Sequence, residues 1–165
     1  MIDRALQKKA AHLLELCRAR SLRIATAESC TGGLVAAALT EIAGSSDVVE
    51  CGFVTYSNEA KEAMLGVPEA TLKSFGAVSA ETAWAMAAGA LARSHADLAV
   101  AITGIAGPGG GSKQKPVGLV HFAAARRDGH HVMRRKLFGE IGRRRVRLRS
   151  VAEALAMLEF LAQQP

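Results

Sequence analysis

The sequence predicts an α/β domain in which a mixed sheet is covered by helices on both faces. Short apolar runs typical of buried strands alternate with helical patterns as far as residue 103. Two further apolar runs flank Asp128-Gly129, a strong hairpin signal, so at least one pair of strands is antiparallel. The 165 residues show no internal repeat, linker or domain boundary, and we expect a single domain over residues 1–165.

Five elements are expected in the first part of the chain. Apolar residues at helical spacing, among them Leu13 and Cys17, predict the first helix, and a short apolar run after it predicts a buried strand. Gly44 is a plausible C-cap for the next helix, and Asn58 is a good N-cap for a short helix. The expected elements are helices over residues 2–20, 34–42 and 58–65 and strands over residues 22–27 and 51–57.

The rest of the chain predicts two long helices and three strands. Ser79 and Glu81 are typical of the start of a helix, which continues through an alanine-rich segment. The uniformly apolar run after it is expected to be a central strand, because central strands are buried on both faces. The expected elements are helices over residues 79–95 and 143–161 and strands over residues 98–103, 117–125 and 131–138.

The net charge of +6 is concentrated in one segment, since eight of the 21 basic residues lie between Arg134 and Arg149. Such a local patch suits one phosphate-bearing ligand or a solvated face better than a long nucleic-acid track. Only 4% of the residues are aromatic, which leaves few rings on which bases could stack. We therefore expect no nucleic-acid partner.

The cysteines and the N-terminus predict a cytoplasmic protein. Cys17, Cys30 and Cys51 are odd in number and lack the paired spacing of a disulfide framework or a zinc site. The histidines likewise show no spacing typical of metal ligands. Residues 1–9 are charged and amphipathic without an uninterrupted apolar stretch, so we expect neither a signal peptide nor a membrane span.

A turn over residues 26–33 places Ser29 between the first strand and the second helix. The unpaired amides of residues 30–33 and the helix dipole would stabilise an oxyanion there, which suits a nucleophilic serine. Serine in such a turn is also a common N-cap, and this alternative remains open. Gly32 and Gly33 weaken a first helical turn by up to ~1 kcal/mol each, which indicates close approach to the backbone by a ligand or by the sheet.

Three segments that begin where predicted strands end are expected to form one site, because the carboxyl ends of parallel strands face one crevice. They are residues 27–33, 56–61 and 103–112. Lys61, in the first turn of a helix, would have a lowered pKa and could accept the proton of Ser29, as in Ser-Lys variants of the serine triad. The alternative is an exposed surface lysine. The glycine-rich third segment lacks the order of a P-loop and could either bind an anion or close over the site.

Cys30 is the competing nucleophile, because a thiol at a helix N-terminus ionises readily. The alternative is a small buried residue in the first turn. None of the predicted positions of the histidines falls beside the carboxyl end of a strand, so no histidine competes with Lys61 as the base.

Five motifs in order carry a family resemblance. They are Thr26-Ala-Glu-Ser-Cys-Thr-Gly-Gly33, Gly52-Phe-Val-Thr-Tyr-Ser-Asn-Glu-Ala-Lys61, Gly76-Ala-Val-Ser79, Thr103-Gly-Ile-Ala-Gly-Pro108 and Lys115-Pro-Val-Gly118. The chain resembles the CinA C-terminal family nearly end to end, and within it the stand-alone nicotinamide-nucleotide amidohydrolases. The resemblance implies a three-layer α/β/α domain with a mixed, mostly parallel five-stranded sheet. It also implies hydrolysis of nicotinamide mononucleotide (NMN) to nicotinate mononucleotide and ammonia in pyridine nucleotide recycling, without a metal or a cofactor.

The resemblance further implies roles for particular residues, with Ser29 as the nucleophile of an acyl-enzyme mechanism and Lys61 as its base. The chain departs from the family at Phe138-Gly-Glu-Ile-Gly-Arg-Arg-Arg-Val-Arg147, where an inserted residue leaves the register of the phosphate-binding arginines open. Arg144 or Arg145 could replace Arg143. The expected substrate-binding residues are Thr31, Gly32, Gly33, Tyr56, Asn58, Thr103, Gly104, Arg143 and Arg147.

Two further expectations concern function and assembly. A non-catalytic nucleotide-binding module could use the same glycine turns without needing Ser29 or Lys61, and it is the alternative to an enzyme. Members of the family often form dimers, and the alanine-rich helix over residues 79–95 could offer a flat interface. We therefore expect a homo-oligomer, a dimer or higher.

Overall fold

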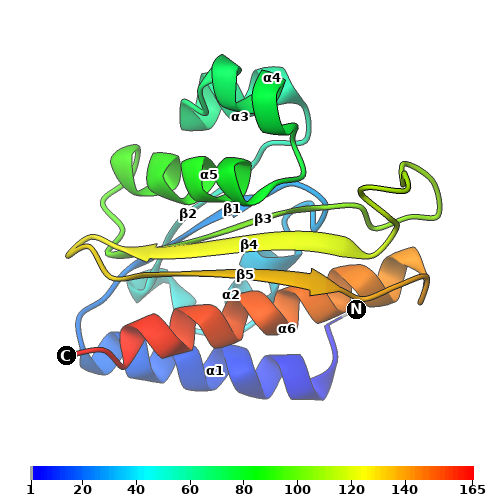
Figure 1. Ribbon diagram of the computed structural model, residues 1–165. Coiled ribbons are helices and arrows are strands. Elements are labelled where there is room, and N and C mark those ends of the chain that lie inside the picture. The colour runs from blue at the N-terminus through cyan, green and yellow to red at the C-terminus, as the bar shows by residue number, and fades with distance from the viewer. Residues whose placement is uncertain (1) are drawn as a thin grey trace.

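The computed structural model describes residues 2–165, so Met1 of the expected domain lies outside the described residues. Its centre is a five-stranded mixed sheet in the order β2-β1-β3-β4-β5 (Figure 1). The strands are β1 (Ile24–Glu28), β2 (Val49–Val54), β3 (Leu98–Gly104), β4 (Leu119–Arg126) and β5 (His131–Leu137). The predicted mixed sheet is confirmed.

The first three strands form the parallel part of the sheet. β1 pairs in parallel with β2 on one side and with β3 on the other, and Glu28 at the end of β1 is in register with Val54 and Ile102. β4 runs antiparallel to β3, and β5 runs antiparallel to β4, as the Asp-Gly pair predicts. The carboxyl ends of β1, β2 and β3 therefore meet at one end of the sheet, with β1 in the middle.

Helices cover both faces of the sheet and complete three layers (Figure 1). One face carries α1 (Arg4–Ala19), α2 (Leu34–Thr40) and α6 (Arg143–Ala162), and the other face carries α5 (Ala80–Ala92). The short helices α3 (Asn58–Leu65) and α4 (Glu69–Phe75) pack on α5, and a 3₁₀ turn, η1 (Ser45–Asp47), precedes β2. Of the helices that the structure describes, none is both long and apolar enough to cross a bilayer.

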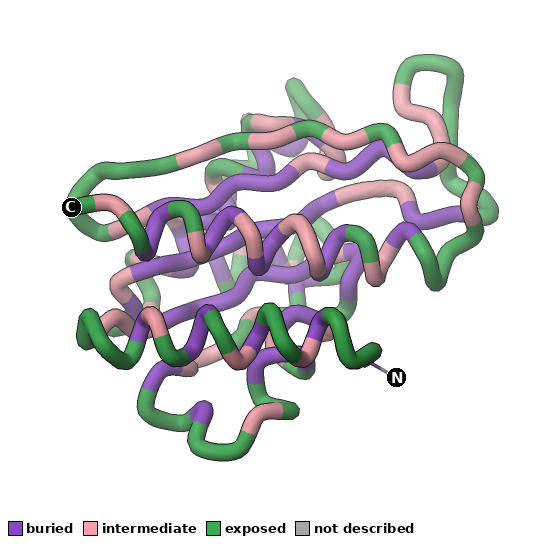
Figure 2. Tube along the Cα trace, turned by 90° about the horizontal axis from the view of Figure 1, so that it is seen from below, coloured by how far each residue is buried: buried purple, intermediate pink, exposed green. Residues whose placement is uncertain are grey.

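Two apolar clusters fill the layers. The larger cluster lies between the sheet and α1, α2 and α6, and it contains large side chains such as Leu13, Phe122 and Leu155. The smaller cluster lies under α5 and consists mostly of alanines, among them Ala83 and Ala101. Figure 2 shows the buried residues running along the strands and along one side of the helices. Aliphatic side chains thus form most of the core, as the low aromatic content requires.

Several boundaries differ from the predictions. Ser57 rather than Asn58 caps α3, because the Ser57 hydroxyl accepts a hydrogen bond from the amide of Ala60 at 3.0 Å. β2 ends before residue 57, since its pairing with β1 stops where β1 ends. α4 was not predicted: it follows directly after Pro68 and buries only Leu72, so it has no apolar stripe that could reveal it.

β5 is an edge strand whose exposure alternates along its length. Residues 131, 133, 135 and 137 are exposed, and those between them are half-buried. Two of the half-buried residues, Arg134 and Lys136, form ion pairs with Glu153 of α6 at 2.6 Å and 3.4 Å. Part of the basic patch is therefore paired with an acid rather than free for a ligand.

Candidate active site

Ser29 lies directly beyond β1, between the ends of the two neighbouring strands. Its amide donates to the carbonyl of Ile102 in β3 at 2.9 Å, and the amide of Thr55 beyond β2 donates to the carbonyl of Glu28 at 2.9 Å. These bonds continue the pairing of the sheet and fix the main chain at the serine. Ser29 does not cap α2, whose N-cap residue is Gly33, so the capping interpretation is wrong.

Glu28 caps α2 instead. Its carboxylate is fully buried and accepts hydrogen bonds from the amides of Gly33 at 3.0 Å, Val35 at 3.1 Å and Ala36 at 2.9 Å. A negative charge in this position also interacts favourably with the helix dipole. This role of Glu28 was not predicted, because the residue belongs to the strand and lies six residues before the helix begins. The available signal was an acidic residue at the end of a strand that is otherwise uncharged.

The expectation that all four amides of residues 30–33 face the serine is therefore wrong. The amide of Gly33 is bound to Glu28, and the amide of Gly32 donates to the carbonyl of Ser29 at 3.0 Å. Within residues 2–165, the amides of Cys30 and Thr31 have no main-chain hydrogen-bond partner, and of these two residues Cys30 lines the cavity described below. Gly32 and Gly33 have φ angles of 59° and 91°, a left-handed conformation that favours glycine, so the backbone itself accounts for the glycine pair.

Lys61 is buried and its amine contacts the serine. Only 1% of the residue is exposed, and Nζ donates to Ser29 Oγ at 3.1 Å and to the carbonyl of Thr55 at 2.8 Å. None of the ion pairs within residues 2–165 includes Lys61, and burial lowers the pKa of its amine. The alternative of an exposed surface lysine is wrong.

A cavity of about 280 Å³ lies over the serine and the lysine. It is at the carboxyl ends of the three parallel strands, where ligands bind in open α/β sheets. All three segments that the sequence analysis singled out contribute to its wall. The lining consists of Ser29, Cys30, Tyr56, Lys61, Ala77, Val78, Thr103, Gly104, Ile105, Ala106, Gly107, Gly109, Gly110 and Arg143.

Arg143, the first residue of α6, connects two walls of this cavity. Its Nη2 donates to the hydroxyl of Tyr56 at 2.8 Å, and its Nη1 donates to the carbonyl of Gly107 at 3.0 Å. Tyr56 is 60% exposed, so the pair lies at the solvent side of the site. Arg144 and Arg145 are exposed and lie outside the lining.

The remaining predicted residues have varied positions. Thr103 lines the cavity, but its hydroxyl donates to the carbonyl of Ala77 at 2.6 Å and so holds the wall together. Thr31 is buried, with a hydroxyl that has no hydrogen-bond partner among the described residues. Asn58 is exposed at the first position of α3 and does not line the cavity. The cavity lining also does not include Thr31, Gly32, Gly33 or Arg147.

Arg147 lies on the far side of the turn that carries Ser29. Its Nε donates to the carbonyl of Cys30 at 3.1 Å, and its Nη2 donates to the carbonyl of Thr31 at 2.8 Å. Two of its donors are thus bound to the protein backbone. Arg147 was expected to bind the phosphate of the substrate, and these backbone partners were not predicted.

Cys30 is poorly suited to be the nucleophile. The residue is 5% exposed, and burial raises the pKa of its thiol to about 11. The expectation of a readily ionised thiol is wrong, and the alternative of a small buried residue is confirmed.

Within residues 2–165, no three His, Cys, Asp or Glu side chains come together in an arrangement that could hold a metal ion. His121 lies in β4, where burial lowers the pKa of its imidazole.

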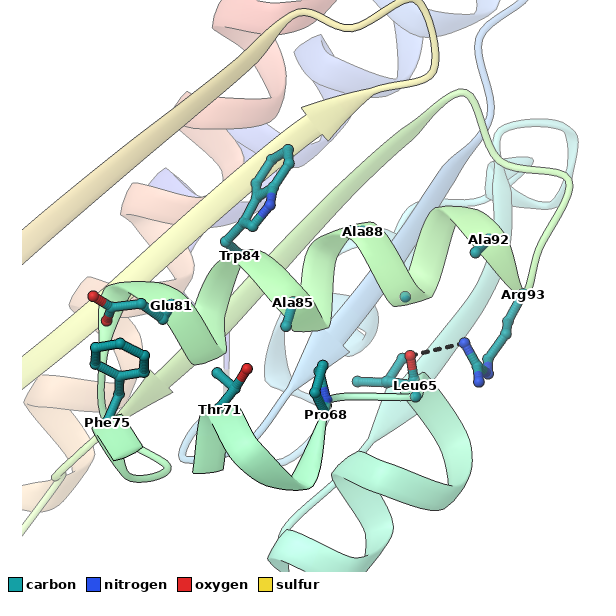
Figure 3. A pocket seen from close by; sticks show the side chains of 12 residues that line it. Leu65, Pro68, Thr71, Phe75, Glu81, Trp84, Ala85, Ala88, Ala92 and Arg93 are labelled. Carbon is teal, nitrogen blue, oxygen red and sulfur yellow. Dashed lines mark hydrogen bonds between the residues drawn. The ribbon is translucent and has the colours of Figure 1, made fainter. Parts of the chain in front are cut away.

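A larger cavity, of about 560 Å³, lies elsewhere on the molecule (Figure 3). It is formed between α5 and the α3–α4 segment, and apolar residues such as Leu65, Phe75 and Trp84 line much of it. The guanidinium of Arg93 at one end donates to the carbonyl of Leu65 at 2.8 Å. None of its lining residues lines the cavity over Ser29, so the volume of a cavity does not by itself identify the reactive site.

Known proteins are similar to this chain in both sequence and fold. The chain is 50% identical over 158 residues to the nicotinamide-nucleotide amidohydrolase PncC of Escherichia coli strain K12, which covers 96% of this chain and 95% of that protein. It is 60% identical over 114 residues to a CinA-like protein of Chloroherpeton thalassium, but that match covers only 27% of the longer protein.

Two crystal structures show the same architecture. The competence/damage inducible protein CihA from Agrobacterium tumefaciens has a TM-score of 0.97 and 53% identity, with 99% of each chain covered. The competence damage-inducible protein A (ComA) from Klebsiella pneumoniae has a TM-score of 0.91 and 38% identity, with 97% of this chain and 99% of that chain covered. The CinA C-terminal domain model matches residues 6–161, and the chain belongs to this family, as its motifs predicted.

Proposed function

We propose that this chain hydrolyses the carboxamide of NMN to give nicotinate mononucleotide and ammonia. The observation that carries the proposal is the 3.1 Å contact between the buried amine of Lys61 and the hydroxyl of Ser29 at the cavity. A relative of nearly the same length carries the name nicotinamide-nucleotide amidohydrolase, which supports the choice of substrate. The positive pyridinium ring of NMN makes its carboxamide more electrophilic.

In the first half of the reaction, neutral Lys61 accepts the proton of Ser29 Oγ as the oxygen attacks the carboxamide carbon. A C–O bond forms, and the carbonyl oxygen of the substrate becomes an oxyanion. Protonated Lys61 then donates to the amide nitrogen, the C–N bond breaks, and ammonia leaves. The nicotinoyl group remains on Ser29 as an ester.

In the second half, water replaces ammonia and the steps run in reverse. Lys61 accepts a proton from the water as its oxygen attacks the ester carbon, and a second oxyanion forms. The bond to Ser29 Oγ breaks, the serine regains a proton from Lys61, and nicotinate mononucleotide is released. The depressed pKa of Lys61 is consistent with this role, because a base must be neutral before it can accept a proton.

Two groups complete the proposed site. The amides of Cys30 and Thr31 hold the oxyanion, since those of Gly32 and Gly33 are bound within the protein. Arg143 holds the phosphate, because it lines the cavity and is exposed to solvent. A phosphate in this position would also lie near the N-terminal end of α6.

The proposal is tested by incubating the purified chain with NMN and measuring ammonia and nicotinate mononucleotide together. Parallel reactions with nicotinamide riboside and free nicotinamide show how far the phosphate and the ribose contribute. We expect release of the two products from NMN in a one-to-one ratio. Binding of NMN without any ammonia release, over a range of pH, would instead favour a non-catalytic nucleotide-binding module.

A further inference from the structure

Arg147 contacts the turn of Ser29 from behind rather than from the cavity. It is half-buried in the second turn of α6, and it donates to the carbonyls of Cys30 and Thr31 at 3.1 Å and 2.8 Å. None of the ion pairs among residues 2–165 includes Arg147, so no carboxylate in contact neutralises its charge. A permanent positive charge is therefore applied to two peptide groups of the turn.

These two peptide groups lead directly to the amides that remain available for an oxyanion. The carbonyl of Cys30 belongs to the same peptide group as the amide of Thr31, so Arg147 polarises that amide through one planar unit. The carbonyl of Thr31 shares a peptide group with the amide of Gly32, which donates to the carbonyl of Ser29 at 3.0 Å. The carbonyl of Ser29 in turn shares a peptide group with the amide of Cys30.

Both amides thus end a chain of hydrogen bonds that begins on one guanidinium. Hydrogen bonds in such a chain strengthen one another, because each polarises the next peptide group. The pKa of the Cys30 thiol is consistent with this: burial has the largest effect and raises it, the amide of Cys30 lowers it, Glu28 raises it, and Arg147 and Arg143 lower it. The positive charge of Arg147 therefore favours an anion at this turn, whereas the buried carboxylate of Glu28 disfavours one.

We propose that Arg147 is a positioning residue for the oxyanion site, which orients and polarises the amides of Cys30 and Thr31 through the peptide groups of the turn. The proposal rests on the proposed reaction at Ser29. It gives Arg147 a role different from the phosphate contact that the family resemblance implies. The two roles affect different kinetic constants, because an oxyanion exists only during the reaction, whereas the phosphate is bound in the ground state as well.

The test compares Arg147→Met, which removes the charge, and Arg147→Lys, which keeps it, with Arg149→Met as the matched control. Arg149 is an exposed arginine in the same helix and lies outside the cavity lining. For each variant, kcat and KM are measured on NMN, and the melting temperature is recorded. Calorimetric titration with NMN measures ground-state affinity in Ser29→Ala and in the double variant Ser29→Ala/Arg147→Met.

We expect Arg147→Met to lower kcat by roughly 10- to 100-fold, somewhat less than the loss of an oxyanion donor itself, with KM within about twofold of the wild type. Arg147→Lys should recover part of kcat. An ammonium group keeps the charge, but it cannot reproduce both hydrogen bonds that the planar guanidinium donates to the carbonyls of Cys30 and Thr31. Ser29→Ala and Ser29→Ala/Arg147→Met should bind NMN equally well. Arg149→Met should have the kcat and KM of the wild type.

Four results would overturn the inference. A raised KM with unchanged kcat, together with weaker NMN binding in the double variant, would make Arg147 a phosphate ligand. Unchanged kcat in Arg147→Met would show that the chain of hydrogen bonds from Arg147 has no effect on the reaction. If Arg147→Met does not fold, Arg147→Lys decides. A kcat equal to that of the wild type, at unchanged KM, rejects the inference, and a reduced kcat at unchanged KM supports it. If the wild-type chain releases no ammonia from NMN, the proposed function fails and this inference fails with it.

Discussion

Glu28→Gln should destabilise the fold, although it changes a single atom type in the side chain. In the wild-type structure, Oε2 of Glu28 accepts from the amides of Gly33 and Val35, and Oε1 accepts from the amide of Ala36. A glutamine has one carbonyl oxygen and one NH₂ group. If its oxygen keeps the first two bonds, its NH₂ group faces the amide of Ala36, donor against donor.

The cost follows from these contacts. Losing a hydrogen bond to a charged acceptor costs about 1.5–3 kcal/mol, and leaving a buried donor unpaired costs a further ~1–3 kcal/mol, with part of the two effects shared. We expect the free energy of unfolding to fall by about 3 kcal/mol. For a domain of this size, that corresponds to a decrease in Tm of roughly 6–12 °C.

Urea unfolding followed by circular dichroism measures this change, and an unchanged m value would show that the unfolded state is the same. Glu15→Gln is the matched control, since Glu15 is exposed on α1 and its replacement should change stability by less than about 0.5 kcal/mol. If the free energy of unfolding of Glu28→Gln is also within about 0.5 kcal/mol of the wild type, the three hydrogen bonds to Glu28 contribute little to stability. That result would refute the role of Glu28 as the cap of α2.

Three further predictions concern catalysis. Ser29→Ala should abolish ammonia release from NMN while the fold is kept, and Cys30→Ala should retain most activity; the reverse pattern would make this a cysteine hydrolase. Because burial lowers the pKa of Lys61 and only the neutral amine is a base, kcat/KM should rise with pH through an apparent pKa below the ~10.4 of free lysine. Lys61→Arg should be inactive, since a guanidinium stays protonated, and near-normal activity there would rule out base chemistry. Arg143→Ala should weaken transition-state binding of NMN by about 1.5–3 kcal/mol, measured from kcat/KM, and an equal loss on nicotinamide riboside would show that Arg143 does not bind the phosphate.

The parts of the site that follow from topology could be predicted from the sequence. Ser29 and Lys61 each follow a strand of the parallel part of the sheet, and parallel strands bring their carboxyl ends together whatever the details of packing. The sheet itself was predictable for a similar reason, because an apolar run such as that of β3 is typical of a strand buried on both faces.

The contacts that orient the site could not be predicted in this way. Glu28 and Arg147 bind main-chain groups of the same turn, and which amides or carbonyls a long side chain reaches depends on three-dimensional geometry rather than on spacing. The choice between Ser57 and Asn58 as the cap of α3 was similarly open, since both residue types are good caps and they are adjacent.

The alternating exposure of β5 has a consequence for how copies of the chain meet. An edge strand offers unpaired main-chain groups to any other strand, and charged side chains are a common protection against such pairing. Exposed Arg135 lies between Arg134 and Lys136, so two β5 strands that approached each other would bring like charges together. Salt screens this repulsion, and the exposed side chains of Met133 and Leu137 would then favour self-association. Edge-to-edge aggregation of this protein should therefore increase with ionic strength.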